Sequence, residues 1–163
     1  MIAATDASLR AMVLIAAPAK TGRAIAAQQR RDAIDHDASI PPAQRDSIFA
    51  ALERASEVVY AQPGWTHFYV NYDPLSVASR VRLPTLILQG ETDTQVTPDH
   101  ATILAGALRA RGNRDVSVRT FANMNHLMLD DPSGNVGGYG KLPSYAVRRD
   151  FLGALSDWLA SKL

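Results

Sequence analysis

The sequence predicts an α/β protein built on a mostly parallel sheet, and three observations support this fold class. Residues 83–89 are an apolar run that contains Pro84 near its start and is followed by Gly90, as is typical of a strand buried on both faces. A similar apolar run at 11–17 and an alternating one at 116–121 are separated from it by segments with helical periodicity. Polar loops follow the strands 83–89 and 116–121, at the edge where open α/β sheets place their chemistry.

The composition suits one domain over residues 1–163 and argues against several classes of partner. An apolar fraction of 47% is enough for a sizeable core, and 17 basic against 16 acidic residues give a net charge of +1. We therefore expect no nucleic-acid partner, and the lack of a long apolar run argues against a membrane partner. Without cysteine the chain forms no disulfide or thiolate metal site, and we expect a cytoplasmic location.

The first half of the chain reads as one strand followed by helices. Residues 1–10 have helical composition, and the strand 11–17 follows them, with an apolar sequence expected to be buried on both faces. A helix over 24–34 starts at Thr21, and proline ends it before a second helix over 43–61. The second helix is expected to bury one apolar stripe. That stripe consists of Ile48, Phe49, Leu52, Ala55, Val58 and Val59.

An aromatic-rich segment at 65–72 precedes the central strand. We favour a short helix packed onto the sheet, and the alternative is one wall of an acyl pocket. Residues 73–76 have the Asp-Pro pattern of a turn that leads into another helix.

The second half alternates helices and strands. A helix over 97–111 is expected to have Thr97 as its N-cap and Gly112 in its C-cap, and the strand 116–121 has the alternation of an edge strand. The expected buried residues of this helix are Ile103, Leu104, Ala107 and Leu108. The glycine-rich stretch 132–143 is expected to be a mobile loop before a last helix over 144–162. The last helix is expected to bury Val147, Phe151, Leu152, Leu155, Trp158 and Leu159.

Two residues at the ends of these strands form a candidate catalytic pair. Asp93 follows the strand 83–89, and His126 follows the strand 116–121, which is the order of acid and histidine in a Ser–acid–His relay. Asp93 would accept the Nδ1 hydrogen of His126, and His126 would remove a proton from a nucleophile. Separately, each residue has an ordinary explanation as a loop or capping residue, but their joint placement favours catalysis. Glu91 is a weaker candidate for the acid.

The other histidines indicate neither a metal site nor a cofactor site. His36 lies among three aspartates, but the spacing favours a hydrated helix end over metal ligation. His67 and His100 are expected to be surface or capping residues. The sequence therefore predicts no metal ligand and no cofactor.

Residues 84–96 resemble the segment of α/β-hydrolases that carries the triad acid, and residues 125–129 resemble their histidine loop. The similarity is greatest to the carboxylesterase, dienelactone-hydrolase and prolyl-oligopeptidase-like branch. It implies a catalytic acid at Asp93, a catalytic histidine at His126, a small-molecule ester substrate, and a cap-like helical segment at 20–72 over the active site. The implied fold is a truncated α/β-hydrolase core of about three strands with flanking helices.

The nucleophile of that family is missing from the sequence, since no G-x-S-x-G motif occurs. Six serines lack glycines at the required offsets: Ser8, Ser39, Ser47, Ser56, Ser76 and Ser79. The resemblance implies the C-terminal portion of an esterase that begins just after the nucleophile. Two functions stay open: a carboxylic ester hydrolase in which the pair activates water, or an inactive module for assembly or binding.

The strand 11–17 also predicts self-association. It contains neither charge nor an internal proline to protect an exposed edge, so we expect it to pair with a second copy. The expected state is a homodimer or larger assembly. The competing expectation is a monomer in which residues 1–10 or a cap helix folds back over the edge.

Overall fold

The computed structural model describes residues 2–162, and the chain forms two compact units. The first unit combines the segment up to Ala19 with the chain from Pro74 onward, and the second is Lys20–Asp73. The second unit covers nearly the same residues as the predicted cap-like segment 20–72, and its role as a cap stays a prediction. Among the described residues, none of the helices combines the length and the apolar composition needed to cross a bilayer.

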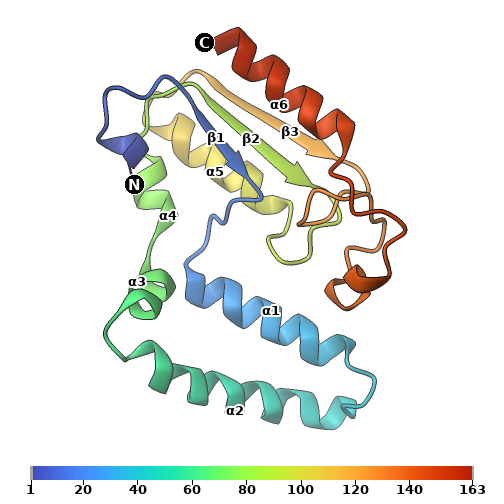
Figure 1. Ribbon diagram of the computed structural model, residues 1–163. Helices are drawn as coiled ribbons and strands as arrows, with labels where there is room; N and C mark the ends of the chain where they lie inside the picture. The colour runs from blue at the N-terminus through green and yellow to red at the C-terminus, as the bar shows by residue number, and fades with distance from the viewer. Residues whose placement is uncertain (1, 163) are drawn as a thin grey trace. The chain divides into compact units, whose positions relative to one another are not determined.

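The first unit contains one sheet of three parallel strands (Figure 1). Its strands are β1 (Met12–Ile15), β2 (Thr85–Gly90) and β3 (Val116–Phe121), in the order β1-β2-β3. The three predicted strands, their parallel direction and their neighbours are therefore confirmed. Because the strands are parallel, their carboxyl ends meet at one edge of the sheet, where the polar loops begin.

The two apolar strands differ in burial. All six residues of β2 are buried, as predicted for a central strand. The prediction that the first strand is buried on both faces is wrong, because β1 lies at one side of the sheet and Ile15 is 42% exposed. A continuous apolar sequence is compatible with either position, since burial depends on which strand and helix lie beside it.

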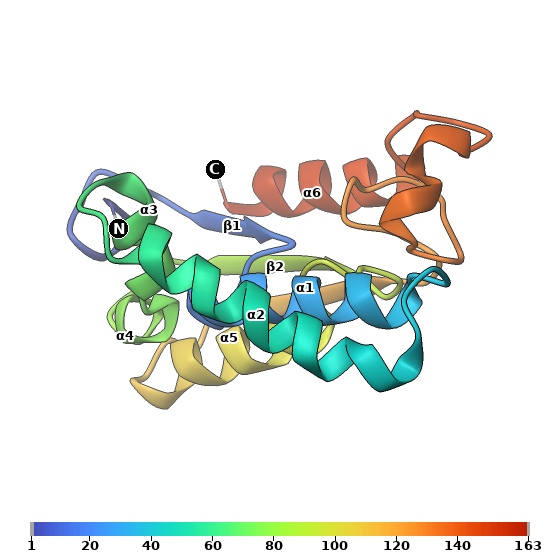
Figure 2. The same ribbon diagram turned by 90° about the horizontal axis from the view of Figure 1, so that it is seen from below.

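Helices cover both faces of the sheet (Figures 1 and 2). The covering helices are α5 (Asp99–Ala110) on one face and α6 (Arg149–Lys162) on the other, with α4 (Pro74–Ala78) packed beside α5. Side chains of β2 alternate between the two layers, as pleating requires. Ile87 joins the cluster with Leu104 and Leu108 of α5, whereas Leu86 and Leu88 join the cluster on the α6 side.

Two helix predictions need correction at the level of single residues. Thr97 is not the N-cap of α5, because Pro98 occupies that position and the Thr97 hydroxyl donates to Asp99 Oδ1 instead. Ile103 is 37% exposed, so the buried face is displaced from the predicted one. The buried residues of this helix are His100, Ala101, Leu104, Ala105 and Leu108.

The last helix is shorter than predicted. It begins at Arg149, since the preceding residues are tied to the histidine loop: Arg148 N–H donates to Met128 O at 3.1 Å, and its guanidinium donates to Ala122 O. Its buried residues are Phe151 and Ala154. Leu152 is 48% exposed, because only one side of this helix faces the sheet.

The stretch 132–143 is not loop throughout. Residues Val136–Lys141 form a short 3-10 helix, η2, whose N-cap Asn135 accepts a hydrogen bond from Gly137 N–H at 2.9 Å. A second 3-10 turn, η1, covers Ile2–Ala4 within the predicted helical segment 1–10.

The second unit consists of α1 (Gly22–His36), α2 (Pro42–Tyr60) and α3 (Trp65–Asn71). The predicted start of α1 is confirmed, and Thr21 is its N-cap, since Thr21 Oγ1 accepts from Ala24 N–H at 3.3 Å. The aromatic segment is helical as predicted, and α3 packs against α1 and α2.

The buried stripe predicted for α2 is wrong. Leu52 is 42% exposed and Val58 is 67% exposed, and Tyr60 is the buried residue of α2. Polar contacts join α2 to α1 instead, including a 2.6 Å ion pair between Arg30 and Glu53. An apolar stripe indicates which side of a helix can be buried, but its burial requires another segment to pack against that side.

Candidate functional site

Asp93 lies in the loop that follows β2, at the carboxyl edge of the sheet, and its side chain is fully buried. Its Oδ1 accepts hydrogen bonds from the backbone N–H groups of Gln95 and Val96, each at 2.9 Å. These two bonds close a tight turn and fix the orientation of the carboxylate. They leave Oδ2 facing the histidine loop.

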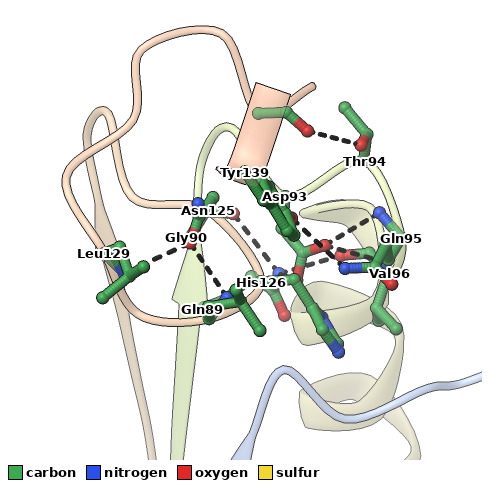
Figure 3. A network of polar contacts seen from close by, with 12 residues as sticks. Gln89, Gly90, Asp93, Thr94, Gln95, Val96, Asn125, His126, Leu129 and Tyr139 are labelled. Atoms are coloured by element: carbon green, nitrogen blue, oxygen red, sulfur yellow. Dashed lines mark hydrogen bonds and ion pairs between the residues drawn. The ribbon is translucent and has the colours of Figure 1, made fainter. Parts of the chain in front are cut away.

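His126 donates from Nδ1 to Asp93 Oδ2 at 2.9 Å (Figure 3). The acceptor is a carboxylate, so this nitrogen carries the hydrogen and Nε2 lies on the other side of the ring. The hydrogen bond to Asp93 raises the pKa of His126, partial burial lowers it, and the Asp93 charge raises it further, so the net shift is upward. The predicted contact between these two residues is confirmed, while their catalytic role stays a prediction.

The His126 side chain is 30% exposed, although its partner is fully buried. The buried Asp93 side chain holds one edge of the ring, and part of the His126 side chain is open to solvent. This is the arrangement required of a general base, which must be oriented from one side and reach a proton on the other.

Gln89 also binds the acid, and the sequence analysis missed it. This fully buried side chain in β2 donates from Nε2 to Asp93 Oδ2 at 3.1 Å and to Val96 O at 2.9 Å. Among the described residues, no group donates to its Oε1 atom. The atoms that contact Nε2 are all hydrogen-bond acceptors, so the nitrogen of the amide must face them. A polar residue inside an otherwise apolar strand was the signal that could have identified it.

Asn125 and Asp131 are two further buried polar residues that the sequence analysis missed. Asn125 Oδ1 accepts from the backbone N–H groups of Leu127 and Leu129, at 2.9 and 3.2 Å. Its Nδ2 donates to Asp131 Oδ2 at 3.1 Å. The side chain next to His126 in sequence therefore lies inside the turn that carries the histidine.

Side chains of the acid loop reach the histidine loop at three further points. Thr92 Oγ1 donates to Asp131 O at 2.6 Å, and Thr94 Oγ1 donates to Gly134 O at 2.8 Å. Gln95 Nε2 donates to the hydroxyl oxygen of Tyr139 at 3.2 Å. Together with the Asp93–His126 contact, these bonds join the two loops into one network, and Figure 3 shows its part around Asp93, Thr94 and Gln95.

The Tyr139 hydroxyl is a weak acid in this network. Burial raises the pKa of Tyr139, the hydrogen bonds from Gln95 and from the His126 backbone lower it, and nearby carboxylates raise it, with a net upward shift. The phenol is therefore neutral over the ordinary pH range and acts as a hydrogen-bonding group.

The remaining candidates lie outside the pair. Glu91 accepts from the Thr120 hydroxyl at 2.6 Å on the exposed side of the sheet edge, so Asp93 is the better acid. His36 and His67 bind backbone carbonyls, of Asp32 and Tyr60, at 2.7 and 2.8 Å. Within the residues described, no group of three potential metal ligands occurs.

The surface or capping role predicted for His100 is wrong. Its side chain is fully buried, and its Nδ1 accepts from Ala19 N–H at 2.8 Å. It therefore joins the first turn of α5 to the segment that follows β1. We expected His100 to be exposed because it lies in the first turn of the helix. The segment after β1 covers this side of the turn and buries the side chain.

Comparison with known proteins identifies one related family and several solved structures with a similar fold. The sequence profile of the prolyl oligopeptidase family matches residues 57–148. No curated protein sequence matches. Among solved structures, the chain is similar to a hydrolase from Pseudomonas aeruginosa PA01, with 19% identity, a TM-score of 0.52, and coverage of 97% of this chain and 58% of that one.

Two other solved structures are also similar. One is BpoC from Mycobacterium tuberculosis H37Rv, a candidate non-heme bromoperoxidase. It is 14% identical, with a TM-score of 0.52, and the match covers 99% of this chain and 62% of that one. A proposed dienelactone hydrolase from Klebsiella pneumoniae subsp. pneumoniae MGH 78578 shares 20% identity with a TM-score of 0.41, over 60% of this chain and 38% of its own. The chain thus spans less than two thirds of the length of each of these proteins.

Proposed function

The chain belongs to the prolyl oligopeptidase family, and from this membership we propose that it contributes the acid–base half of a carboxylic ester hydrolase site. The fold is that of the α/β-hydrolases, in three parallel strands with helices on both faces. The observation that carries the proposal is the 2.9 Å contact from His126 Nδ1 to the buried Oδ2 of Asp93.

In the proposed mechanism, His126 accepts a proton at Nε2 from a hydroxyl nucleophile or a water molecule. As the imidazolium forms, Asp93 stabilises its positive charge through the Nδ1 hydrogen bond and keeps the ring in one tautomer. The proton on Nε2 is then given to the leaving alcohol as the acyl bond breaks. Gln89 and the two backbone donors to Oδ1 hold the carboxylate in place during these steps.

The sequence contains no G-x-S-x-G motif, so the nucleophile within these residues would be water. General-base assistance to water contributes on the order of 10²–10⁴-fold, less than a complete triad with its oxyanion hole. The substrate we propose is therefore an activated small-molecule ester, that is, one whose alcohol leaves readily with little stabilisation by the protein.

Hydrolysis of p-nitrophenyl acetate tests the proposal. The native protein should accelerate hydrolysis above the buffer rate, and His126→Ala should reduce the acceleration on the order of 10²-fold or more. His36→Ala, which removes an exposed histidine of the second unit, is the matched control for nonspecific imidazole catalysis. Equal rates for the native protein and His126→Ala would refute His126 as the base.

A second proposal is a module for assembly, and the open side of β1 favours it. Ile15 is 42% exposed on a strand that has a paired neighbour on one side, β2. Labelling with a fluorophosphonate probe distinguishes the two proposals. A labelled serine would show a nucleophile, whereas no labelling and no turnover, combined with a defined oligomer, would favour the module.

A further inference from the structure

We infer that Asn125 and Asp131 are the positioning pair of this site: their contact holds the turn that places His126 against Asp93. The inference rests on the proposed function for its catalytic meaning. Its structural content is the claim that the Nδ1–Oδ2 hydrogen bond of the acid–histidine pair depends on an amide–carboxylate contact one residue away from the histidine.

The first step of the argument is that Asn125 fixes the backbone on both sides of His126. Its side chain accepts from Leu127 N–H and Leu129 N–H, and its own N–H donates to Leu129 O at 3.1 Å. Its carbonyl accepts from Met128 N–H at 3.1 Å. The backbone groups that follow His126 are thus hydrogen-bonded to Asn125, the residue before it. A rotation of Asn125 would therefore move the His126 imidazole.

The second step is that the turn is closed and conformationally demanding. Met124 and Asp130 form an isolated antiparallel bridge, and Asp131 N–H donates to Asn123 O at 2.7 Å. Met128 has a φ of +61°, a conformation that residues with a Cβ atom seldom adopt. Such a conformation persists only where the surrounding contacts determine it, and the Asn125 side chain binds the N–H groups of Leu127 and Leu129 on either side of Met128.

The third step is that Asp131 connects the turn to the acid loop. Its backbone carbonyl accepts from Thr92 Oγ1 at 2.6 Å, so the acid loop, which contains Asp93, is hydrogen-bonded to Asp131. Its Oδ1 accepts from Ser133 N–H, the Ser133 hydroxyl and Gly134 N–H, at 3.0, 2.7 and 3.1 Å. Its Oδ2 accepts from Asn125, which completes a continuous path from the acid loop to the histidine turn.

The charge of Asp131 is consistent with this role. Burial would raise the pKa of its carboxyl group, but the hydrogen bonds from Ser133, Asn125 and Gly134 outweigh burial and lower it. The ionised carboxylate is therefore the form that the site selects. An ionised side chain that is 2% exposed needs strong partners, and here these partners are the groups that shape the histidine turn.

An exchange of the two side chains tests the inference. Asn125→Asp keeps an acceptor for Leu127 and Leu129 but brings two carboxylates together. Asp131→Asn keeps the acceptor for Ser133 and Gly134 but brings two amide NH₂ groups together. In the double variant Asn125→Asp/Asp131→Asn, the new amide donates to the new carboxylate, and each hydrogen bond of the native network is restored with its direction reversed at one contact.

The measurement is proton NMR of the His126 Nδ1–H, whose carboxylate-bonded hydrogen gives a separate downfield resonance. We expect this resonance to be lost in each single variant and recovered in the double variant. Asn123→Asp is the control: it adds the same charge to an exposed position of the same turn and should retain the resonance. Circular dichroism of each variant establishes whether it is folded.

The outcomes decide the inference without reference to turnover. Retention of the resonance in both folded single variants would overturn it, and so would its loss in a folded double variant. If the single variants fail to fold, the double variant must fold and show the native resonance, and its failure to do so would also overturn the inference. Absence of esterase activity in the native protein would instead count against the proposed function and leave the NMR result unaffected.

Discussion

Replacing Gly134 by alanine should loosen the junction between the acid loop and the histidine loop. Gly134 has a φ of +60°, and a Cβ atom built on it would lie 1.7 Å from the backbone oxygen of Thr92. Contacts below 3.0 Å between a Cβ and backbone do not occur, so one of the two loops must move.

The expected cost has two parts. The left-handed conformation costs an alanine roughly 1–2 kcal/mol. Movement of the loop would also break the bonds from Thr94 Oγ1 to Gly134 O and from Gly134 N–H to Asp131 Oδ1, which contribute about 1 kcal/mol each. We therefore expect Gly134→Ala to lower the free energy of unfolding by about 3–4 kcal/mol.

Urea denaturation monitored by circular dichroism measures this change, and Gly140→Ala is the matched control. Gly140 lies in the same segment, and no heavy atom lies within 4 Å of a Cβ built there. The control should change stability by less than about 1 kcal/mol. Similar unfolding midpoints for the two variants would refute the argument that the loops touch at Gly134.

Three other predictions follow from the sheet and the site. Leu88→Ala removes a fully buried side chain from the α6 side of the core and should cost about 2–5 kcal/mol in urea denaturation, whereas a loss below about 1 kcal/mol would place Leu88 outside the core. Because the pKa of His126 is raised above its ordinary 6.5, its charged contact should stabilise the fold below about pH 6.5 and lose that contribution as the pH rises through the raised value. Comparison of native and His126→Gln stabilities against pH checks this, and a constant difference would contradict it. We also predict a homodimer through the open side of β1, so light scattering should give a dimeric mass for the native protein and a monomeric mass for Ile15→Lys; a native monomer would refute it.

The central features of the fold were predictable because they depend on local patterns. The buried run of β2 and the polar loop after it identified both the middle of the sheet and the position of Asp93. The order of acid and histidine after neighbouring strands then predicted the contact that the structure shows. Parallel strands bring their carboxyl ends together whatever the details of the helices, so this part of the site needs little tertiary information.

The features that were missed depend on close approach between segments far apart in sequence. Asn125 and Asp131 look like ordinary loop residues until the turn is folded, since their burial results from the contact between the histidine loop and the acid loop. The same applies to His100, which is buried by the chain after β1. The exposed stripe of α2 shows the converse case, because periodicity alone does not reveal whether a surface has a partner.

The pH dependence of p-nitrophenyl acetate hydrolysis, measured beside the NMR titration of His126, tests the proposed acid–base pair most directly. The rate should rise with pH as His126 loses its proton, with a midpoint that matches the NMR pKa and lies above 6.5. Asp93→Asn removes the carboxylate whose hydrogen bond and charge raise this pKa, so both midpoints should move down together and the rate should fall. A rate profile with no inflection at the His126 pKa, or one that Asp93→Asn leaves unchanged, would contradict the assignment.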